Sequence, residues 1–327
     1  CRGAAAGAAV KEQKTLMNGI INVYKEAGYT SFDVVAKLRG ILREKRIGHT
    51  GTLDPEATGV LPVCVGNATK VCAILTDKDK VYEAVLHLGL TTDTQDATGT
   101  VLSDHSEQAI RLDEQTVRDT VMDFVGIYEQ IPPMYSALKV GGRKLCDLAR
   151  EGIEVERKAR TVQIYEITIS KVDLPDVTML VHCSKGTYIR TLCHDIGQAL
   201  LCGGAMASLT RTRVGSFQIG QAYLLAKLQQ LSDEGRLSEA VLPVEEVFSH
   251  LPVMHVEEAG MKALLNGNQL KKSELEAAGT EKAAAVKTEE ASGYRVRIHG
   301  LDDRFYGVYE YIEEKGLYCP VKMFFPE

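Results

Sequence analysis

The sequence predicts a loop-rich protein of the α/β or α+β class, with one large domain and a smaller appendage. Its 327 residues exceed what a single hydrophobic core usually supports, so a second structural unit is expected. Apolar residues make up 45% and charged residues 25% of the chain, as in ordinary globular proteins, and 29 glycines indicate many tight turns. Segments with the two-residue period of strands and segments with helical period occur along the same chain.

The N-terminal elements are predicted in the order tail, strand, helix. Residues 1–16 begin with an Ala- and Gly-rich stretch and contain no continuous apolar segment, which indicates a flexible tail. A short strand is predicted at 19–25, and a helix begins near Thr30 or Ser31, with Ser31 as its N-cap. The apolar residues of this helix recur at helical spacing: Val34, Val35, Leu38, Ile41 and Leu42.

Residues 46–59 are predicted to form a loop, because they contain three glycines and a proline. Pro55 restricts the preceding Asp54 to an extended conformation, so this segment displays the Asp54 carboxylate rather than burying it. An Asp before Pro also closes ordinary Asx-type turns. The local pattern leaves that structural alternative open.

The middle of the chain continues with short elements and one irregular segment. Strands are predicted at 82–88, 161–170 and 177–183, and helices at 68–75, 113–124 and 188–201. Residues 91–99 are predicted to be a polar turn. Residues 125–158 are too irregular for a core element and are predicted to be a mobile insertion, made partly basic by Arg143 and Lys144 in its Gly-rich turn.

The C-terminal part is predicted to be a small β module. Short alternating segments predict strands near 294–298, 305–309 and 317–320, and the Glu-, Ala- and Lys-rich residues 274–290 predict a loop. The net charge of the chain is −6, and the acidic surplus lies in the last part, from residue 232 onward. The preceding part is close to neutral and can carry a local basic groove.

Cysteine and histidine patterns predict neither a metal nor a cofactor. The eight cysteines form no C-x-x-C pair and lie mostly in apolar runs, which is typical of reduced thiols in a cytosolic protein. His87, His182 and His194 lack the spacing of metal ligands. No apolar run reaches the roughly 20 residues that a membrane helix needs, so a cytoplasmic protein without a membrane span is expected.

A run of 15 residues around Asp54 carries a specific resemblance. Residues 48–62, Gly-His-Thr-Gly-Thr-Leu-Asp-Pro-Glu-Ala-Thr-Gly-Val-Leu-Pro, resemble the signature of the TruB family of tRNA pseudouridine synthases. Further similarities follow in the family's order and extend the resemblance over most of residues 17–248. They lie at Asn67–Lys70, Lys80–Ala84, Gln130–Ala137, Ser184–Leu192 and Leu209–Arg213.

The resemblance implies a fold and a division of the chain. It implies the pseudouridine synthase fold over residues 17–248, a mixed, largely antiparallel sheet with flanking helices. The insertion at 125–158 resembles the family's RNA-binding insertion, with Arg143 and Lys144 among its contacts. Residues 249–327 resemble the small PUA-like β module that such enzymes often carry. No protein partner is required, and a monomer is expected.

The resemblance also implies catalytic roles for three residues. Asp54 is the essential carboxylate, which either attacks the base or assists through a glycal intermediate. Arg190 is the cation beside it, expected to lower the pKa of Asp54. Because Arg190 lies in the first turn of a predicted helix, where the macrodipole disfavours a cation, a compensating anion is expected nearby. Tyr82 would stack on the target base. The structural alternatives remain open: Tyr82 as an ordinary core tyrosine, and Arg190 as a surface arginine paired with any carboxylate.

Four more residues are implied to contact RNA. His49 would hold the RNA loop open after the uridine has flipped out of its stack. Tyr188 is a second candidate for the base pocket, and Leu209 for its wall. Lys70 would contact phosphate or the catalytic loop. Ordinary structural roles remain open for His49 and Leu209, and a solvated helix position remains open for Lys70.

The implied substrate is tRNA, at the uridine of the T loop, since single-stranded loops are the usual targets of sequence-specific RNA recognition. A guide-RNA-dependent relative that works inside a ribonucleoprotein is a close alternative, although the insertion favours the stand-alone type. An RNA-folding chaperone of tRNA with dispensable catalysis is the alternative from another class.

Overall fold

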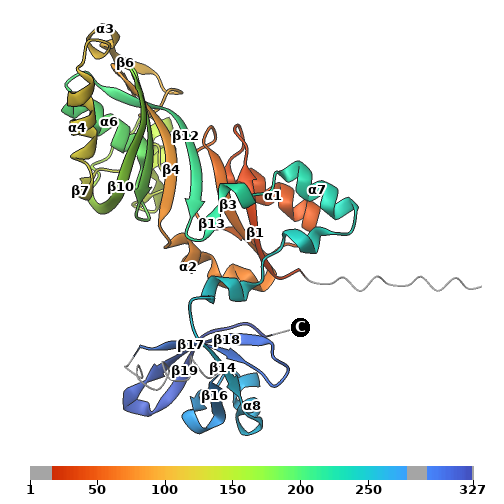
Figure 1. Ribbon diagram of the computed structural model, residues 1–327. Coiled ribbons are helices and arrows are strands. Elements are labelled where there is room, and N and C mark those ends of the chain that lie inside the picture. The colour runs from red at the N-terminus through yellow and green to blue at the C-terminus, as the bar shows by residue number, and fades with distance from the viewer. Residues whose placement is uncertain (1–16, 278–292, 326–327) are drawn as a thin grey trace, which may run out of the picture.

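The computed structural model describes residues 17–277 and 293–325, and most of its strands form two sheets (Figure 1). One sheet has nine strands, and the other, near the C-terminus, has six. Two hairpins stand apart: β5 (Leu90–Thr92) with β6 (Val101–Asp104), and β8 (Lys139–Val140) with β9 (Arg143–Lys144). The predicted α+β class is confirmed, whereas the predicted flexible tail at 1–16 lies outside the described residues.

The large sheet is mixed and mostly antiparallel, as predicted. Its strands are β1 (Gly19–Lys25), β2 (Ile47–His49), β3 (Thr58–Val65), β4 (Lys80–Leu88), β7 (Gly126–Gln130), β10 (Arg160–Asp173), β11 (Asp176–Cys183), β12 (Gly204–Val214) and β13 (Phe217–Gln218). Their order is β1-β3-β12-β4-β11-β10-β7, with β2 paired to β3 and β13 to β12. Only β3 and β12 pair in parallel; all other neighbours in this sheet are antiparallel.

Helices cover the large sheet in two groups (Figure 1). α4 (Glu114–Met122) and α6 (Ile189–Ala199) pack with β4, β10 and β11, while α1 (Ser31–Leu42) and α7 (Leu225–Asp233) pack with β1 and β3. The shorter helices are α2 (Cys72–Thr76), α3 (Ser106–Ala109), α5 (Leu145–Arg150) and α8 (Glu258–Leu265). Within residues 17–277 and 293–325, no helix has the length and apolarity needed to cross a bilayer.

The alternation of β4 shows how the sequence builds the core of this sheet. Tyr82, Ala84, Leu86 and Leu88 are buried on one face, whereas Glu83 on the opposite face is exposed. Successive side chains of a strand point to opposite faces, so every second residue meets the helices. Burying one leucine of this kind contributes about 1.5–3 kcal/mol relative to leaving it exposed.

The N-cap of α1 is Thr30, not Ser31 as predicted. The Thr30 hydroxyl accepts the N–H of Asp33 at 3.1 Å, and the Asp33 carboxylate accepts the N–H of Thr30 at 2.9 Å. This reciprocal pair is a capping box, which requires the acidic residue to lie three positions after the cap. Ser31 is the first helical residue, and its hydroxyl accepts the N–H of Leu53 at 2.9 Å instead.

Several segments differ from the sequence predictions. β7 pairs with β10 at the edge of the large sheet, so residues 126–130 are not part of an irregular insertion. β12, which was not predicted as a strand, lies in the middle of the sheet, and β2 lies within the predicted loop 46–59. The predicted helix 68–75 is a 3-10 helix, Gly66–Val71, followed by α2. Each strand that was missed is stabilised by pairing with a distant segment, which local periodicity does not reveal.

The small sheet is the barrel-like C-terminal β module that was expected. Its strands are β14 (Val253–Val256), β15 (Leu270–Lys271), β16 (Leu275–Ala277), β17 (Arg295–His299), β18 (Phe305–Ile312) and β19 (Leu317–Met323), in the order β15-β19-β18-β17-β14-β16. The predicted loop at 274–290 begins with β16, and its residues from 278 onward lie outside the described part of the chain.

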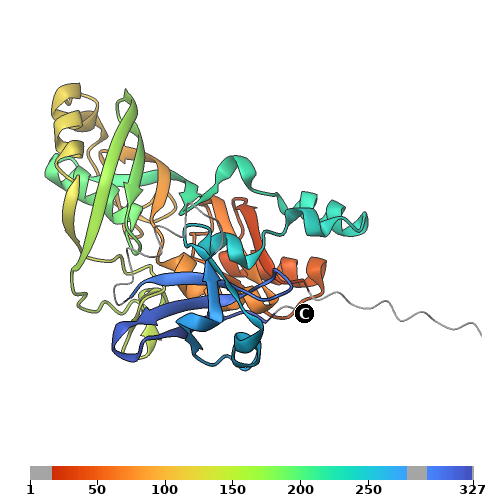
Figure 2. The ribbon, with the colours of Figure 1, turned by 60° about the horizontal axis from the view of Figure 1, so that its bottom comes forward.

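An aromatic cluster joins the two sheets, and Figure 2 shows the small sheet in front of the large one. Phe248 lies between the sheets, with its ring centroid 6.0 Å from that of Phe305 and 6.1 Å from that of Phe324. The same cluster includes Val60 and Cys64 of β3. The aromatic cluster therefore extends to the face of β3 opposite to the one that α1 and α7 cover, where the 3-10 helix Gly66–Val71 and α2 also contribute to it.

Candidate active site

Asp54 lies in the loop between β2 and β3, and side chains of other elements fix the backbone on both sides of it. The N–H of Leu53 donates to Ser31 Oγ at 2.9 Å, and the carbonyl of Pro55 accepts from Lys25 Nζ at 2.8 Å. Lys25 is fully buried, and burial lowers its pKa to about 8. The Asp54 side chain is 36% exposed, so it is largely buried but can still be reached from solvent.

Arg190, in the first turn of α6, faces Asp54 through a two-pronged ion pair. Its Nε lies 2.9 Å from Asp54 Oδ2, and its Nη2 donates to Asp54 Oδ1 at 3.2 Å. Two parallel charge-assisted hydrogen bonds give both strength and a fixed orientation. The Arg190 side chain is only 6% exposed. Because Arg190 lies at a helix N-terminus, an anion was expected beside it, and Asp54 is that anion.

The remaining N–H groups of Arg190 connect two further segments to the site. Nη1 donates to the carbonyl of Thr94 at 3.1 Å, and Nη2 donates to the carbonyl of Tyr135 at 2.7 Å. Nη1 also lies 3.6 Å from Asp96 Oδ2. One buried guanidinium therefore holds together α6, the Asp54 loop, the turn at 91–99 and the insertion.

Asp96 is a site residue that the sequence analysis assigned to a polar turn without further role. Its Oδ1 accepts the hydroxyl of Thr94 at 2.8 Å, the hydroxyl of Thr98 at 2.6 Å and the N–H of Thr98 at 3.0 Å. These bonds leave Oδ2 to face Arg190. Nothing in the local pattern signals this, because the contact joins residues far apart in the chain.

The pKa of Asp54 is raised above its ordinary value, not lowered as expected. Burial is the largest cause, since it disfavours the charged form. Arg190 opposes this effect, and Asp96 adds to it through the repulsion of two like charges. The expectation named the correct cation but omitted the desolvation that comes with holding the carboxylate against a buried guanidinium.

Tyr82 and Arg211 lie opposite each other on β4 and β12, beneath the Asp54 loop. Tyr82 is 9% exposed and belongs to the same apolar cluster as Leu53 and Leu209. Burial raises the pKa of Tyr82, and the Arg211 guanidinium counteracts this in part. Leu209 is buried beside Ala84 of β4, which suits both a pocket wall and an ordinary core position.

Arg211 is a second buried cation that the sequence analysis did not single out. Its Nε donates to the carbonyl of Val60 at 2.7 Å, and its Nη2 donates to the carbonyl of Gly51 at 3.2 Å. It therefore fixes the Asp54 loop at Gly51 and the start of β3 at Val60. The backbone approach is close: Gly59 has φ +104°, and a Cβ there would lie 2.2 Å from the carbonyl oxygen of Arg211. Only glycine suits such a position.

His49 precedes the Asp54 loop and lies near Arg211, whereas Tyr188 lies near Arg190. The N–H of Gly51 donates to His49 Nδ1 at 3.3 Å, and burial together with Arg211 lowers the pKa of His49, which favours a neutral ring. Tyr188 is the N-cap residue of α6. Its backbone N–H and carbonyl bond the Gln130 side chain at 2.8 and 3.0 Å.

Lys70, Arg143 and Lys144 lie elsewhere. Lys70 Nζ donates to the carbonyl of Met323 at 3.0 Å, so its ammonium contacts the small sheet rather than the Asp54 loop. Arg143 and Lys144 are exposed on the β8–β9 hairpin of the insertion, and Arg143 pairs with Glu151. The structure thus brings together Asp54, Arg190 and Tyr82, with His49, Tyr188 and Leu209 around them.

Comparison with known protein families gives two adjoining matches. The profile described as "TruB family pseudouridylate synthase (N terminal domain)" matches residues 39–189. The profile described as "tRNA pseudouridylate synthase B C-terminal domain" matches residues 190–249. The two matches span the Asp54 loop, β4, the insertion, α6 and β12.

Curated relatives match over most of their length. The protein named tRNA pseudouridine synthase B of Lachnoclostridium phytofermentans is 51% identical over 316 residues, which cover 94% of this chain and 100% of the relative. The one of Clostridium kluyveri is 43% identical, over 89% of this chain and 95% of its own. The one of Bacillus pumilus is 42% identical, over 77% and 83%.

Solved structures show the same fold. A Cbf5-Nop10-Gar1 complex contains a chain that is 28% identical, with a TM-score of 0.68 over 94% of this chain and 85% of that one. An H/ACA RNP bound to a substrate RNA containing 2'-deoxyuridine contains one that is 27% identical, with a TM-score of 0.67. From the profiles, the relatives and the shared fold, we conclude that the chain belongs to the TruB family of pseudouridine synthases.

Proposed function

We propose that the chain is a tRNA pseudouridine synthase that converts the T-loop uridine to pseudouridine, with Asp54 as its essential carboxylate. The observation that carries the proposal is the pair of Asp54 and Arg190. An aspartate on a glycine-rich loop is held at both oxygens by a buried guanidinium while its side chain stays partly exposed. The relatives named tRNA pseudouridine synthase B support the choice of substrate.

The proposed reaction breaks the N1–C1′ bond of the uridine and forms a C5–C1′ bond. C5 loses a proton and N1 gains one, so atoms and electrons balance without an oxidant or a reductant. An ionised Asp54 serves either attack on the base or assistance through a glycal intermediate. Each carboxylate oxygen has two acceptor sites, so the two bonds from Arg190 leave one site on each oxygen for the substrate.

Tyr82 and Leu209 would form the floor and wall beneath the target base. The raised pKa of Tyr82 keeps its hydroxyl protonated at neutral pH, so in a proton transfer this group would first act as a donor. Its burial against the Asp54 loop supports a stacking role, because an aromatic face there lies next to the carboxylate. Arg211 would position both the ring and the loop rather than touch the base.

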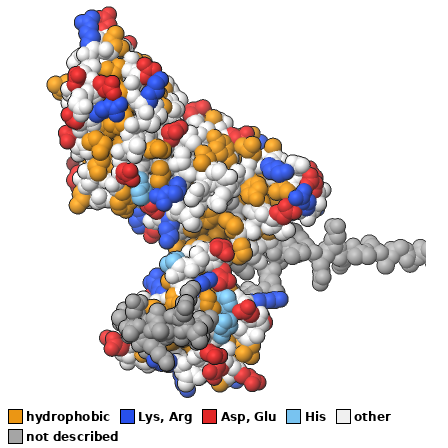
Figure 3. All heavy atoms as spheres, viewed as in Figure 1, with side chains coloured by type: hydrophobic (Ala, Val, Ile, Leu, Met, Phe, Trp, Pro, Cys, Tyr) orange, Lys and Arg blue, Asp and Glu red, His pale blue; other side chains and the backbone are white. Residues whose placement is uncertain are grey.

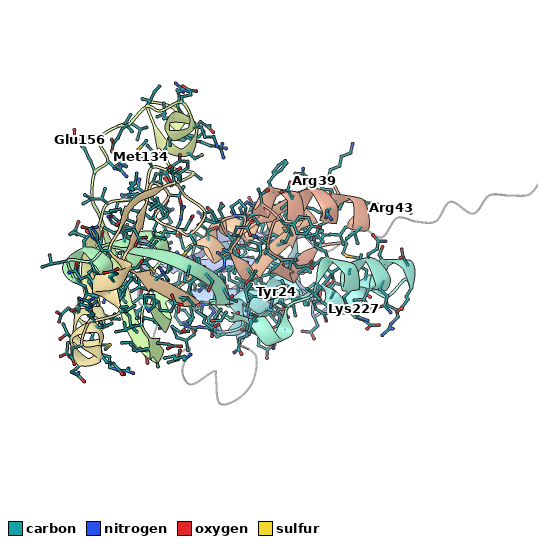
Figure 4. The ribbon with its side chains drawn as sticks, turned by 90° about the horizontal axis from the view of Figure 1, so that it is seen from above. Tyr24, Arg39, Arg43, Met134, Glu156 and Lys227 are labelled. Carbon is teal, nitrogen blue, oxygen red and sulfur yellow. The ribbon has the colours of Figure 1, made fainter. Side chains whose placement is uncertain are left out.

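The proposed RNA site lies between the insertion and α1. Figure 4 shows Met134 and Glu156 of the insertion projecting on the same side of the sheet as Arg39 of α1. The exposed Arg143 and Lys144 of the insertion would contact phosphate there. A uridine in a folded loop has to leave its stack before its glycosidic bond can be reached.

His49 and Tyr188 would act at the mouth of the site. His49 is the last residue of β2, just before the Asp54 loop. Its neutral ring could occupy the gap left by the extruded uridine. Tyr188 is adjacent to Arg190 at the start of α6 and would line the base pocket. Lys70 is proposed to act indirectly, because its ammonium already contacts the small sheet.

The proposal also assigns the parts of the chain and its setting. Residues 17–248 would carry catalysis, and residues 249–327 would form an accessory β module whose acidic composition disfavours strong phosphate contact. The enzyme would act in the cytoplasm, where its proposed tRNA substrate is found, as a monomer without a protein partner. Because two of the similar solved structures are described as H/ACA ribonucleoproteins, a guide-RNA-dependent enzyme is the second candidate.

Release of the C5 hydrogen from a labelled T-loop hairpin, with no guide RNA added, tests the proposal. The wild-type chain should turn over this hairpin, and Asp54→Asn should abolish turnover while hairpin binding is retained. Asp123→Asn, at an exposed aspartate that ends α4, is the matched control and should keep full activity.

The remaining outcomes distinguish the alternatives. Turnover that requires an added guide RNA would favour the guide-dependent enzyme. A folded Asp54→Asn variant that still releases the C5 hydrogen would refute the essential role of this carboxylate. Faster refolding of tRNA by both the wild type and Asp54→Asn, without turnover by either, would favour the chaperone.

A further inference from the structure

Two histidines and an aspartate converge on the surface of the C-terminal β module, away from the Asp54 loop. His255 of β14 and His299 of β17 are direct partners in the parallel pairing of these strands. Asp303 follows in the turn before β18, with φ +58° in the left-handed region that Asp tolerates better than most residues. Figure 3 shows histidine side chains on the surface of this module.

One ligand-type atom from each of the three residues lies within 4.8 Å of the other two. Asp303 Oδ1 is 2.9 Å from His255 Nε2 and 3.3 Å from His299 Nδ1. Zinc binds imidazole nitrogen and carboxylate oxygen at about 2.0–2.2 Å, which places neighbouring ligands of a tetrahedral ion roughly 3.3 Å apart. The two distances from Asp303 Oδ1 are close to this spacing. Asp303 lies in an exposed turn, where its position can adjust.

The second nitrogen of His299 has the partner that a metal-binding histidine needs. His299 Nε2 lies 2.9 Å from Glu245 Oε1, and the same oxygen accepts Arg297 Nη1 at 2.7 Å. If Nε2 donates its proton to this carboxylate, the lone pair of Nδ1 points toward Asp303 and His255. A carboxylate behind the histidine fixes the tautomer and ring orientation in this way at many zinc sites.

We propose that His255, His299 and Asp303 form a binding site for a divalent transition metal of the Zn²⁺ class, oriented by Glu245. Two imidazoles and one carboxylate match the borderline character of Zn²⁺, whereas Mg²⁺ and Ca²⁺ prefer oxygen ligands alone. Asp303 is 83% exposed, so a water can complete four-coordination. The prediction of no metal rested on other histidines and on spacing within short motifs, whereas these histidines come together only through the pairing of β14 with β17.

The site would link three segments of the C-terminal module to one another and, through His299, to Glu245, which lies before the module in the chain. The metal would bridge β14, β17 and the turn at 300–304, and Glu245 lies in the 3-10 helix Val244–Phe248, next to the aromatic cluster between the two sheets. Its role would be to stabilise the docking of the small sheet, apart from the chemistry at Asp54.

Calorimetric titration of the full chain with ZnCl₂, after removal of metals with a chelator, tests the site. The wild type should bind one equivalent of Zn²⁺. The affinity of Asp303→Asn and of His299→Asn for Zn²⁺ should be at least tenfold weaker. Glu245→Gln should weaken binding by about 10–100-fold, as expected for a residue that orients a ligand. Zn²⁺ should also raise the Tm of the wild type but not that of Asp303→Asn.

His105→Asn, at an exposed histidine that makes no side-chain cap for α3, is the matched control and should bind Zn²⁺ like the wild type. Asp303→Asn replaces an exposed side chain, so it keeps the test valid if His299→Asn fails to fold. Equal stoichiometry and affinity for the wild type and folded Asp303→Asn, or no Zn²⁺ binding by the wild type, would overturn the proposal.

Discussion

Asp54 has to be ionised for the proposed reaction, yet its surroundings raise its pKa. Burial and Asp96 raise its pKa, and Arg190 lowers it. The ionised carboxylate disappears as the pH falls through the raised pKa, so activity should decline at a higher pH than it would with an ordinary aspartate, whose pKa is about 3.8. Substitutions of Arg190 and Asp96, the two charged residues that act on Asp54, should move this acid limb in opposite directions.

Arg190→Lys should reduce turnover on the order of 100-fold and shift the acid limb of kcat/KM to higher pH. Lysine is a point charge that cannot make the fork to both carboxylate oxygens, so the ionised form is stabilised less. The measurement is C5 hydrogen release as a function of pH. Arg118→Lys, in the exposed ion pair with Glu114, is the matched control. An unchanged acid limb in folded Arg190→Lys would contradict the role of the fork.

Asp96→Asn should shift the acid limb to lower pH, because it removes the negative charge that helps to raise the pKa of Asp54. Asparagine keeps a side-chain oxygen for the bonds from Thr94 and Thr98, so the turn should be retained. The same pH profile of kcat/KM checks the shift, with the unchanged Tm as evidence that the turn persists. A shift to higher pH would show that Asp96 acts on Arg190 rather than on Asp54.

At the scale of single elements, α1 has two neighbouring hydroxyl residues with different tasks. Thr30 caps the helix through Asp33, whereas Ser31 holds the backbone of Leu53 next to Asp54. The sequence placed a hydroxyl N-cap at this point but could not tell the two apart, because a capping box and a long-range bond both need a residue of this type.

Thr30→Ala should lower the free energy of unfolding by about 1 kcal/mol and leave turnover nearly unchanged. Ser31→Ala should cost a similar amount, since it leaves the Leu53 N–H without its buried acceptor, and should also lower kcat. Urea unfolding gives the stabilities, and C5 hydrogen release gives kcat. Equal effects of both variants on kcat would argue against a specific link between Ser31 and the Asp54 loop.

The spacing of apolar residues along the sequence predicted those helices and strands whose own residues show a regular buried face. The strand that carries Tyr82 and the helix that carries Arg190 were predicted because each shows a clear period of buried residues. β12 was missed because small and polar residues interrupt its alternation, and its stability comes from β4 and β3 on either side. Its buried Arg211 was missed for the same reason.

The candidate site divides in the same way. Asp54 and Arg190 were identified because the residues around them resemble the TruB family, and that resemblance also implied that the arginine lies beside the carboxylate. Asp96 could not be identified, because its role depends on a contact across the fold. The sign of the pKa shift of Asp54 was likewise out of reach, since the extent of burial is a property of the assembled site.

At the scale of the whole molecule, a net charge of −6 has to be reconciled with an RNA substrate. The acidic surplus lies toward the C-terminus, whereas the insertion, whose Met134 and Glu156 project toward the side of the proposed RNA site in Figure 4, carries exposed basic residues. Affinity should therefore come from a few local phosphate contacts, not from the overall field of the protein.

The salt dependence of hairpin binding tests this distribution of charge. The logarithm of the association constant should fall linearly with the logarithm of salt concentration, and changing both Arg143 and Lys144 to Ala should reduce the slope by about one for each phosphate that is no longer neutralised. Lys171→Ala, at an exposed lysine paired with Asp173 on β10, is the matched control and should leave the slope unchanged. Fluorescence anisotropy at several salt concentrations gives both slopes. If the double variant binds with the wild-type slope, the RNA phosphates are bound elsewhere, and the proposed path of the RNA along the insertion is wrong.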